Sequence, residues 1–288
     1  MPRRHAPAAS RQRRAGKAPA GARAGAGSAT PTPRHGLARV LSKLGVCSRT
    51  EAARWVADGR VSVAGRVVRD PEFPLRADQH DGIAIDGQPL AGPARLYLML
   101  NKPRGVVTTV RDEQGRDTVY RCFDGAGLPW LAPVGRLDKA SEGLLLFSND
   151  PQWAAAVTDP ATGPDKTYHV QVDCRPDALQ LARMHDGVAD TDPESDGSLL
   201  RAKQVRVLRE GERNAWLEIV LDEGRNRQIR RLLAALEIGV LRLVRVAIGP
   251  LAMGELGKGS WRLLSAAEVR ALAPAAPAAQ AASAPAAR

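Results

Sequence analysis

The residues best placed to do chemistry lie in segment 135–150, where one aspartate follows a Gly-Arg-Leu lead-in. After Asp138 come a short polar turn and an apolar run, Leu144 to Phe147, dense enough for a strand buried on both faces. Such a strand would hold Asp138 beside the core, where a carboxylate can act as a nucleophile or a base. The spacing alone does not decide, because an aspartate in a turn is also an ordinary turn-former or the partner of a nearby arginine.

Two further segments carry candidate groups. Residues 166–172 alternate like a strand that places Tyr168 on the same face as two valines, where a lone tyrosine normally belongs to the core. Residues 223–233 form a glycine turn and then a helix with a basic face, and such faces are usually just solvated. The apolar face of this helix holds Ile229, Leu232, Leu233 and Leu236, and a neighbouring face holds Arg227, Arg230 and Arg231.

The motif around Asp138 resembles the signature of the pseudouridine synthases, in the branch often called the RsuA family. That signature reads Gly-Arg-Leu-Asp, two variable residues, Thr or Ser, any residue and Gly-Leu-Leu, and the chain matches it from Gly135 to Leu145. The resemblance implies that Asp138 is the indispensable catalytic residue. It also implies that Tyr168, in the family's Lys-x-Tyr motif, packs on the target uracil, and that Arg230, in its Gln-Ile-Arg motif, enters the active site.

The segment after the first 34 residues predicts a compact module. The apolar spacing in 37–44 predicts a helix that Gly45 closes. Ser48 and Glu51 predict a capping box for a second helix, which should end near residue 58. Short strands are expected within 60–68 and 82–87.

This module, roughly residues 36–90, resembles the small α-L RNA-binding domain found in one ribosomal small-subunit protein and in tyrosyl-tRNA synthetases. The likeness lies in Leu-Gly-Val-Cys-Ser-Arg-Thr-Glu-Ala at 44–52 and Gly-Arg-Val-Ser-Val-Ala-Gly-Arg-Val at 59–67. Basic groups of that domain contact the RNA backbone, although any one of them here can equally be a solvated surface charge. The candidates are Lys43, Arg49, Arg54, Arg60 and Arg66.

The 288-residue chain has a formal net charge of +11, and its N-terminal tail carries most of this charge. Residues 1–34 contain eight Lys or Arg and no Asp or Glu, which suits a polyanion but equally fits a solubilising extension. Their Gly and Pro content argues against the amphipathic helix of a transit peptide. No secretory or membrane-spanning run is readable, and three scattered cysteines fit reduced thiols, so we expect a cytoplasmic protein.

Segment 95–272 predicts the catalytic domain, and its opening Leu-Asn-Lys-Pro-Arg-Gly at 100–105 is familiar from the same family. Glu237 stands where relatives commonly have a glycine, which puts the end of the preceding helix in doubt. Strands are expected at 96–105, 106–110, 166–172, 216–221 and 241–248, and helices at 151–157, at 177–184 and after 259–265. Further RNA-binding candidates are Lys102, Arg104, Arg136, Arg225, Arg227 and Arg231.

We therefore expect an α+β protein in which a mixed, largely antiparallel sheet with flanking helices forms the catalytic domain. The expected boundaries are a disordered basic tail at 1–34, the α-L RNA-binding domain at 35–92, the pseudouridine synthase catalytic domain at 95–272, and a disordered Ala/Pro tail at 273–288. The resemblance implies a monomer that isomerises a uridine in ribosomal RNA or a ribosomal subunit precursor, with 23S rRNA favoured over 16S rRNA and no membrane partner.

In that reaction the uracil leaves its sugar through nitrogen and rejoins it through carbon 5. The nucleotide gains and loses no atoms or electrons overall, so no redox cofactor or group donor is expected. No metal site is readable in the sequence. The target nucleotide must leave the base stack. Asp138 must be ionised, either to attack the sugar or to remove a proton from it, and Arg230 is the expected partner that keeps its pKa low.

Two other classes of protein remain as alternatives. One is an RNA-binding protein that keeps this fold and has lost the activity, against which the joint presence of Asp138, Tyr168 and Arg230 argues. The other is a hydrolase, but the paired carboxylates of a glycosidase or the acidic cluster of a nuclease are not visible.

Overall fold

A computed structural model describes residues 34–76, 82–90, 94–109, 112, 114–192 and 197–273 of the chain. The tails predicted to be disordered lie outside the described residues, apart from Arg34 and Ala273. Within the described ranges, no helix is both long and apolar enough to cross a membrane.

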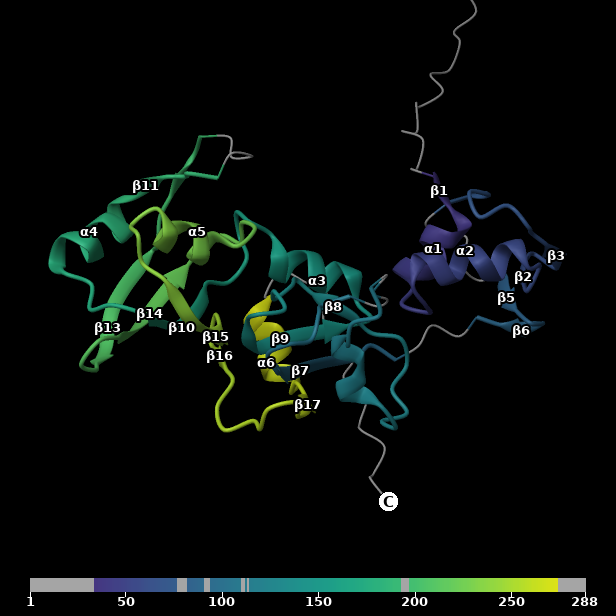
Figure 1. The fold of residues 1–288 in the computed structure, drawn as a ribbon. Coiled ribbons are helices and arrows are strands. Elements are labelled where there is room, and N and C mark those ends of the chain that lie inside the picture. The colour runs from purple at the N-terminus through teal and green to yellow at the C-terminus, as the bar shows by residue number, and fades with distance from the viewer. Residues whose placement is uncertain are drawn as a thin grey trace, which may run out of the picture. The chain divides into compact units, whose positions relative to one another are not determined.

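The N-terminal module contains two helices and two small sheets (Figure 1). The strands β2, β3, β5 and β6 form an antiparallel sheet in the order β3-β2-β5-β6, and β1 pairs with β4. The elements are β1 (Arg34–Gly36), α1 (Leu37–Lys43), α2 (Arg49–Ala57), β2 (Val61–Val63), β3 (Arg66–Val67), β4 (Pro74–Arg76), β5 (Ile83–Ile85) and β6 (Gln88–Pro89).

Local sequence explains this module well. The buried side chains of α1 recur at helical spacing, and Gly45, with φ of +74°, supports the left-handed turn after that helix. The Ser48 hydroxyl accepts a hydrogen bond from the Glu51 backbone N–H at 3.1 Å, which is the Ser48 half of the predicted capping box. The predicted helices and hairpin strands are confirmed, whereas the β1–β4 pairing depends on a contact between distant segments.

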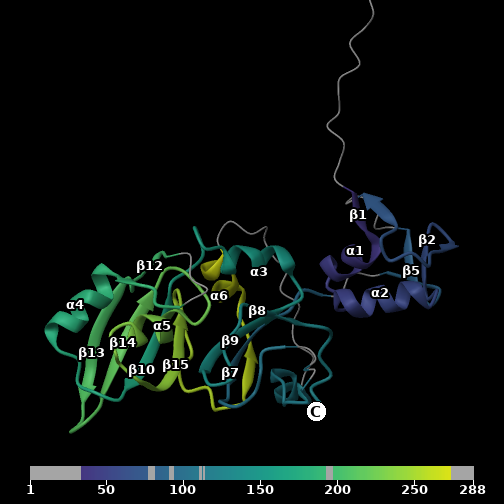
Figure 2. The ribbon, with the colours of Figure 1, turned by 45° about the horizontal axis from the view of Figure 1, so that its top comes forward.

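The larger domain, after the N-terminal module, is built on a nine-stranded sheet (Figure 2). Seven strands follow the order β13-β14-β10-β15-β9-β7-β17, β8 pairs with β9, and β16 pairs with β15. Its strands are β7 (Tyr97–Lys102), β8 (Ala132–Val134), β9 (Glu142–Ser148), β10 (Lys166–Val172), β13 (Gln204–Glu210), β14 (Ala215–Leu221), β15 (Val240–Ile248), β16 (Leu251–Ala252) and β17 (Trp261–Leu263). A separate pair is β11 (Val188–Ala189) with β12 (Leu199–Leu200).

Different helices pack against the two halves of this sheet. Side chains of α5 pack against the strands β10 and β14 in one core cluster, and those of α3 and α6 pack against β7 and β9 in another. Figure 1 shows α4 and α5 beside the β13–β15 half, and α3 and α6 beside β7 and β9. These helices are α3 (Pro151–Thr158), α4 (Ala178–Asp186), α5 (Gln228–Ala234) and α6 (Ala266–Leu272), with a 3₁₀ helix, η1, at Val119–Phe123.

The two halves of the sheet meet at β9 and β15, which form its only parallel pairing among the described strands. In that register Gly143 lies opposite Arg245. A Cβ on Gly143 would stand 2.3 Å from the backbone oxygen of Arg245, and the residue has φ of +103°. Position 143 therefore requires glycine, because a side chain would clash with β15 and because the backbone has a positive φ. This close approach of β9 and β15 explains the glycine of the Gly-Leu-Leu motif.

The predicted α+β architecture is confirmed, and one expected strand is wrong. Residues 106–109 form no ladder, and Val107 makes only an isolated parallel bridge with Thr118. The partners of β7 are β9 and β17 instead. These partners lie about 45 and 160 residues along the chain, so a local pattern after β7 could not identify them.

The end of α5 shows why the position of Glu237 matters. The Glu237 N–H donates to the Ala234 carbonyl and the Ile238 N–H donates to the Leu233 carbonyl, both at 2.9 Å, as in a Schellman turn. Glu237 has φ of +59°, a conformation that glycine adopts most easily. The chain therefore keeps the usual turn with a residue that is less suited to it.

Candidate active site

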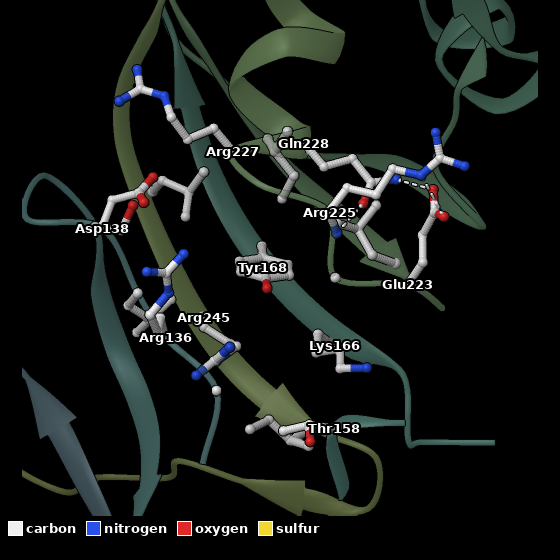
Figure 3. A pocket seen from close by; sticks show the side chains of 18 of the residues that line it. Arg136, Asp138, Thr158, Lys166, Tyr168, Glu223, Arg225, Arg227, Gln228 and Arg245 are labelled. Carbon is white, nitrogen blue, oxygen red and sulfur yellow. Dashed lines mark hydrogen bonds and ion pairs between the residues drawn. The ribbon is translucent and has the colours of Figure 1, made fainter. Parts of the chain in front are cut away.

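A pocket of about 480 Å³ opens where the two halves of the sheet meet. It is lined by the turn before β9, the strands β10 and β15, and the start of α5, and Figure 3 shows Asp138, Tyr168, Lys166 and Arg245 around the same hollow. The structure therefore brings together the three predicted catalytic residues, which are separated by up to 92 positions in sequence. Six lining side chains are cationic, namely Arg136, Lys166, Arg225, Arg227, Arg230 and Arg245, and two are carboxylates, Asp138 and Glu223.

The turn that carries Asp138 is held by backbone hydrogen bonds on both sides. The Thr108 hydroxyl donates to the Leu137 carbonyl at 2.8 Å, and the Ser141 N–H donates to the Asp138 carbonyl at 3.0 Å. The following strand, β9, is buried along its whole length, as its apolar run predicts. The half-buried Asp138 side chain is thus placed at the pocket by a rigid backbone.

Lys102, at the end of β7, lies beneath this turn and is fully buried. Its ammonium group donates to the carbonyls of Pro103 at 3.1 Å, Asp138 at 3.1 Å and Ser141 at 2.7 Å. Burial lowers the pKa of Lys102 to about 8, against the opposing effect of the Asp138 charge. The prediction that Lys102 binds RNA is therefore wrong, because all three of its donors hold protein backbone.

Tyr168 lies in the middle of the sheet, on β10. Its ring is partly buried against two hydrophobic clusters, one from each half of the domain. The prediction that 166–172 is a strand with Tyr168, Val170 and Val172 on one face is confirmed, and the register places Arg245 of β15 directly opposite Tyr168. The ring is thus both a wall of the pocket and part of the core.

Arg230, in the first turns of α5, points to the Asp138 turn. Its Nη2 donates to the Ala140 carbonyl at 3.3 Å. Burial first, then the positive charges of Arg227 and Arg104, lower the pKa of Arg230, and the Asp138 charge acts in the opposite direction. In the described part of the chain no nitrogen of Arg230 lies within 4.0 Å of an Asp138 oxygen, so the expected ion pair is replaced by the contact with Ala140.

Two basic residues of the pocket were absent from the predicted site. Arg245, on β15, is 6% exposed and donates from Nε to the Leu144 carbonyl at 2.7 Å. Lys166 is the lysine of the Lys-x-Tyr motif and lies two residues before Tyr168 on the same strand. The sequence did contain a signal for Arg245. Side chains two residues apart on a strand point to the same face, so Arg245 lies on the same face of β15 as the buried Leu243.

The other predicted RNA-binding residues of this domain divide into two groups. Arg136, Arg225 and Arg227 line the pocket, and Arg104 is exposed near enough to influence Arg230. Arg231 instead forms an ion pair with Asp190 at 2.6 Å, with the Asp190 side chain only 2% exposed. A buried carboxylate inside the protein thus already pairs with Arg231, and its role toward RNA stays a prediction.

The five basic candidates of the N-terminal module are all exposed. Arg60 is the most constrained, because it pairs with Asp86 at 2.5 Å and lies 4.9 Å from the centre of the Trp55 ring. Lys43 contacts His35, while Arg49 and Arg54 lie 3.6 Å and 3.7 Å from Glu72 and Glu51. Arg66 stands at the turn between β2 and β3. Their roles toward RNA stay a prediction.

Known proteins share this arrangement of domains. The family model for RNA pseudouridylate synthases matches residues 96–235, and the S4 domain model matches residues 36–89. An uncharacterized RNA pseudouridine synthase of Aquifex aeolicus is 34% identical over 236 residues, covering 81% of this chain and 92% of its own length. A crystal structure of a pseudouridylate synthase has a TM-score of 0.57 and 26% sequence identity, and the match covers 83% of this chain and 99% of that one.

Two relatives have more specific names. Ribosomal large subunit pseudouridine synthase B of Pseudomonas aeruginosa is 35% identical, with 81% of this chain and 60% of the relative covered. Ribosomal large subunit pseudouridine synthase E of Xanthomonas campestris is 40% identical, and the match covers 61% of this chain and 98% of the relative. Motifs, fold and relatives agree, and the chain belongs to the RNA pseudouridine synthase family, in the RsuA-type arrangement of an S4 domain followed by the catalytic domain.

Proposed function

We propose that this protein converts a specific uridine of large-subunit ribosomal RNA to pseudouridine, with Asp138 as the reactive carboxylate. The observation that supports this most is the convergence of Asp138, Tyr168 and Arg230 on one pocket, from three separate segments of the chain. The large-subunit preference is supported by the names of two relatives and by the Asn-Lys-Pro-Arg-Gly and Gly-Arg-Asn-Arg-Gln wording at 101–105 and 224–228.

The pocket offers what the isomerisation needs. A uracil displaced from the RNA stack can lie on the Tyr168 ring, because a base offers a flat π-face to an aromatic side chain. Asp138 then either attacks the anomeric carbon or removes a proton from the sugar, which releases the uracil for rotation. The surrounding excess of cations attracts the RNA backbone.

The turn that carries Asp138 also fixes the orientation of its carboxylate. Lys102 and Arg230 both donate to carbonyls of the 138–141 turn, so they fix the backbone from opposite elements without occupying the carboxylate. A nucleophile held in this way loses little conformational freedom on binding the substrate. Arg230 is therefore a positioning residue for Asp138 as well as part of the basic pocket wall.

The test is to express Asp138→Asn in a strain that lacks this protein and to map pseudouridine in both ribosomal RNAs. The variant should fold and bind RNA, because Asn keeps the shape of the turn, and should form no pseudouridine. Asp124→Asn, an exposed aspartate outside the pocket, is the matched control and should restore the modification. Turnover by Asp138→Asn would exclude the assigned role, and unmodified RNA with the wild type would favour an RNA-binding protein without activity.

A further inference from the structure

Arg245 lines the pocket, and its guanidinium group has an unused donor. Nε is occupied by the Leu144 carbonyl, whereas Nη2 is buried and has no hydrogen-bond partner within the described part of the protein. The whole residue is 6% exposed. Buried polar groups in native proteins nearly always have a partner, and an unsatisfied donor on a charged group is costly, so this nitrogen is suited to a ligand.

The register of the sheet determines what lies beside this donor. Arg245 is directly opposite Tyr168 across the β10–β15 pairing, and Lys166 is two residues before Tyr168, on the same face. Burial, and after it the positive charge of Arg245, lower the pKa of Lys166. Two cations therefore line the pocket near the ring proposed to carry the uracil, close enough for their charges to interact.

The charges of Asp165 and Asp222 partly offset the positive charge at Lys166, but within the described residues neither carboxylate forms an ion pair with it. Among the described ion pairs none includes Arg245 or Lys166, and Asp165, the nearest charge in sequence, is bound to Lys203 at 2.7 Å. Adjacent like charges in a partly dry pocket repel each other, and an anion placed between them removes that repulsion. A neutral carbonyl of the base would fill the free donor and leave the charge uncompensated.

We propose that Arg245 and Lys166 form a subsite for a phosphate group of the target nucleotide, adjacent to Tyr168. The fixed Nε bond to Leu144 holds the guanidinium plane, and the free Nη2 meets a phosphate oxygen while Lys166 supplies the second charge. The subsite would align the sugar between the ring of Tyr168 and the carboxylate of Asp138. This inference rests on the proposed function, because it assumes that a uridine occupies the pocket.

The experiment is a set of NMR titrations of the full chain with uridine, uridine 5′-monophosphate, uridine 3′-monophosphate and inorganic phosphate. Either or both monophosphates should bind the wild type about tenfold or more tightly than uridine, as expected for a charge-assisted contact. The comparison of the two monophosphates identifies the phosphate that is recognised. Arg245→Gln should abolish this advantage and Lys166→Gln should reduce it, with the affinity for uridine itself unchanged.

Arg175→Gln removes an exposed arginine paired with Glu210 outside the pocket and is the matched control, which should keep the full advantage. If Arg245→Gln does not fold, the reduced monophosphate advantage of Lys166→Gln tests the subsite alone. Equal binding of all ligands by the wild type would overturn the subsite, as would a phosphate advantage that persists in both variants. A lowered Tm of Arg245→Gln with an unchanged advantage would leave Arg245 as an anchor of β9 only.

Pseudouridine mapping keeps this test distinct from that of the proposed function. A wild type that prefers the monophosphates but forms no pseudouridine would support the subsite and overturn the proposed reaction. An active wild type that binds uridine and the monophosphates equally would support the proposed reaction and overturn the subsite.

Discussion

The ammonium group of Lys102 and the backbone carbonyl of Asp138 are joined by a hydrogen bond of 3.1 Å, although 36 residues separate them in the chain. Because Lys102 also holds the carbonyls of Pro103 and Ser141, one buried charge organises the turn that carries the proposed reactive carboxylate. Lys102 is fully buried and does not line the pocket, so we expect its influence on the reaction to pass through the position of Asp138.

The activity of the protein should therefore depend on the protonation of Lys102. The protonated side chain has three donors for three carbonyls, whereas the neutral amine has two. Since the pKa of Lys102 in the folded protein is lowered to about 8, kcat should fall above that pH with an apparent pKa of about 8. Steady-state rates between pH 7 and 10 check this, and a rate that stays constant to pH 9.5 would contradict it.

Stability should change in the opposite direction. An unfolded chain keeps the Lys102 proton up to about pH 10.5, so between pH 8 and pH 10.5 the unfolded state binds more protons than the folded state. The contribution of this residue to the free energy of unfolding therefore rises with pH across that window. Lys102→Met is the control: it should lack this pH dependence and lose about 3 kcal/mol of stability, because three carbonyls in one buried and two part-buried hydrogen bonds lose their donor.

Tyr168→Phe should separate stacking from proton transfer. The ring that we propose carries the uracil, and that packs on the core, is kept, so RNA affinity and Tm should be unchanged. Only the hydroxyl is removed, which is the plausible acceptor or relay for the proton leaving carbon 5, and kcat should fall roughly 100-fold. Tyr168→Leu, which removes the ring as well, should weaken RNA binding. Wild-type kcat in Tyr168→Phe would exclude the hydroxyl from the reaction.

Glu237→Gly should stabilise the protein. Glu237 is held in the left-handed conformation that ends α5, which costs a residue with a Cβ about 1 kcal/mol relative to glycine. Denaturant unfolding should therefore show a gain of about 1 kcal/mol with unchanged activity, since the residue does not line the pocket. Glu237→Ala keeps the Cβ and should give no gain, so equal stabilisation by both substitutions would point to the lost charge instead.

Deleting residues 1–33 should make RNA binding less sensitive to salt. This segment contains seven Lys or Arg and no carboxylate, and each cation that reaches a phosphate adds roughly 0.7 to 0.9 to the slope of log affinity against log salt. The deletion keeps Arg34, whose strand β1 pairs with β4. Filter binding of rRNA fragments at several salt concentrations measures the slope, and an identical slope for both chains would show that the tail makes no phosphate contact.

Much of this protein was readable from the sequence because its elements depend on local patterns. The buried run of β9, the alternation of β10 and the start of α3 at Pro151 follow from residues within one element. The motifs around Asp138, Tyr168 and Arg230 likewise identified the family and the three residues that share the pocket. These features require only that side chains alternate, recur or cap within a few positions of each other.

The tertiary structure decided the role of each basic residue, because charge type and sequence spacing do not tell which partner a long side chain will meet. Lys102 and Arg231 had the appearance of RNA contacts, but strand pairing buries the first under the Asp138 turn and α5 brings the second to Asp190. Arg245 had no motif of its own and became part of the pocket because β15 lies between β9 and β10. Such assignments rest on pairings between segments up to 165 residues apart, which depend on the packing of the whole sheet.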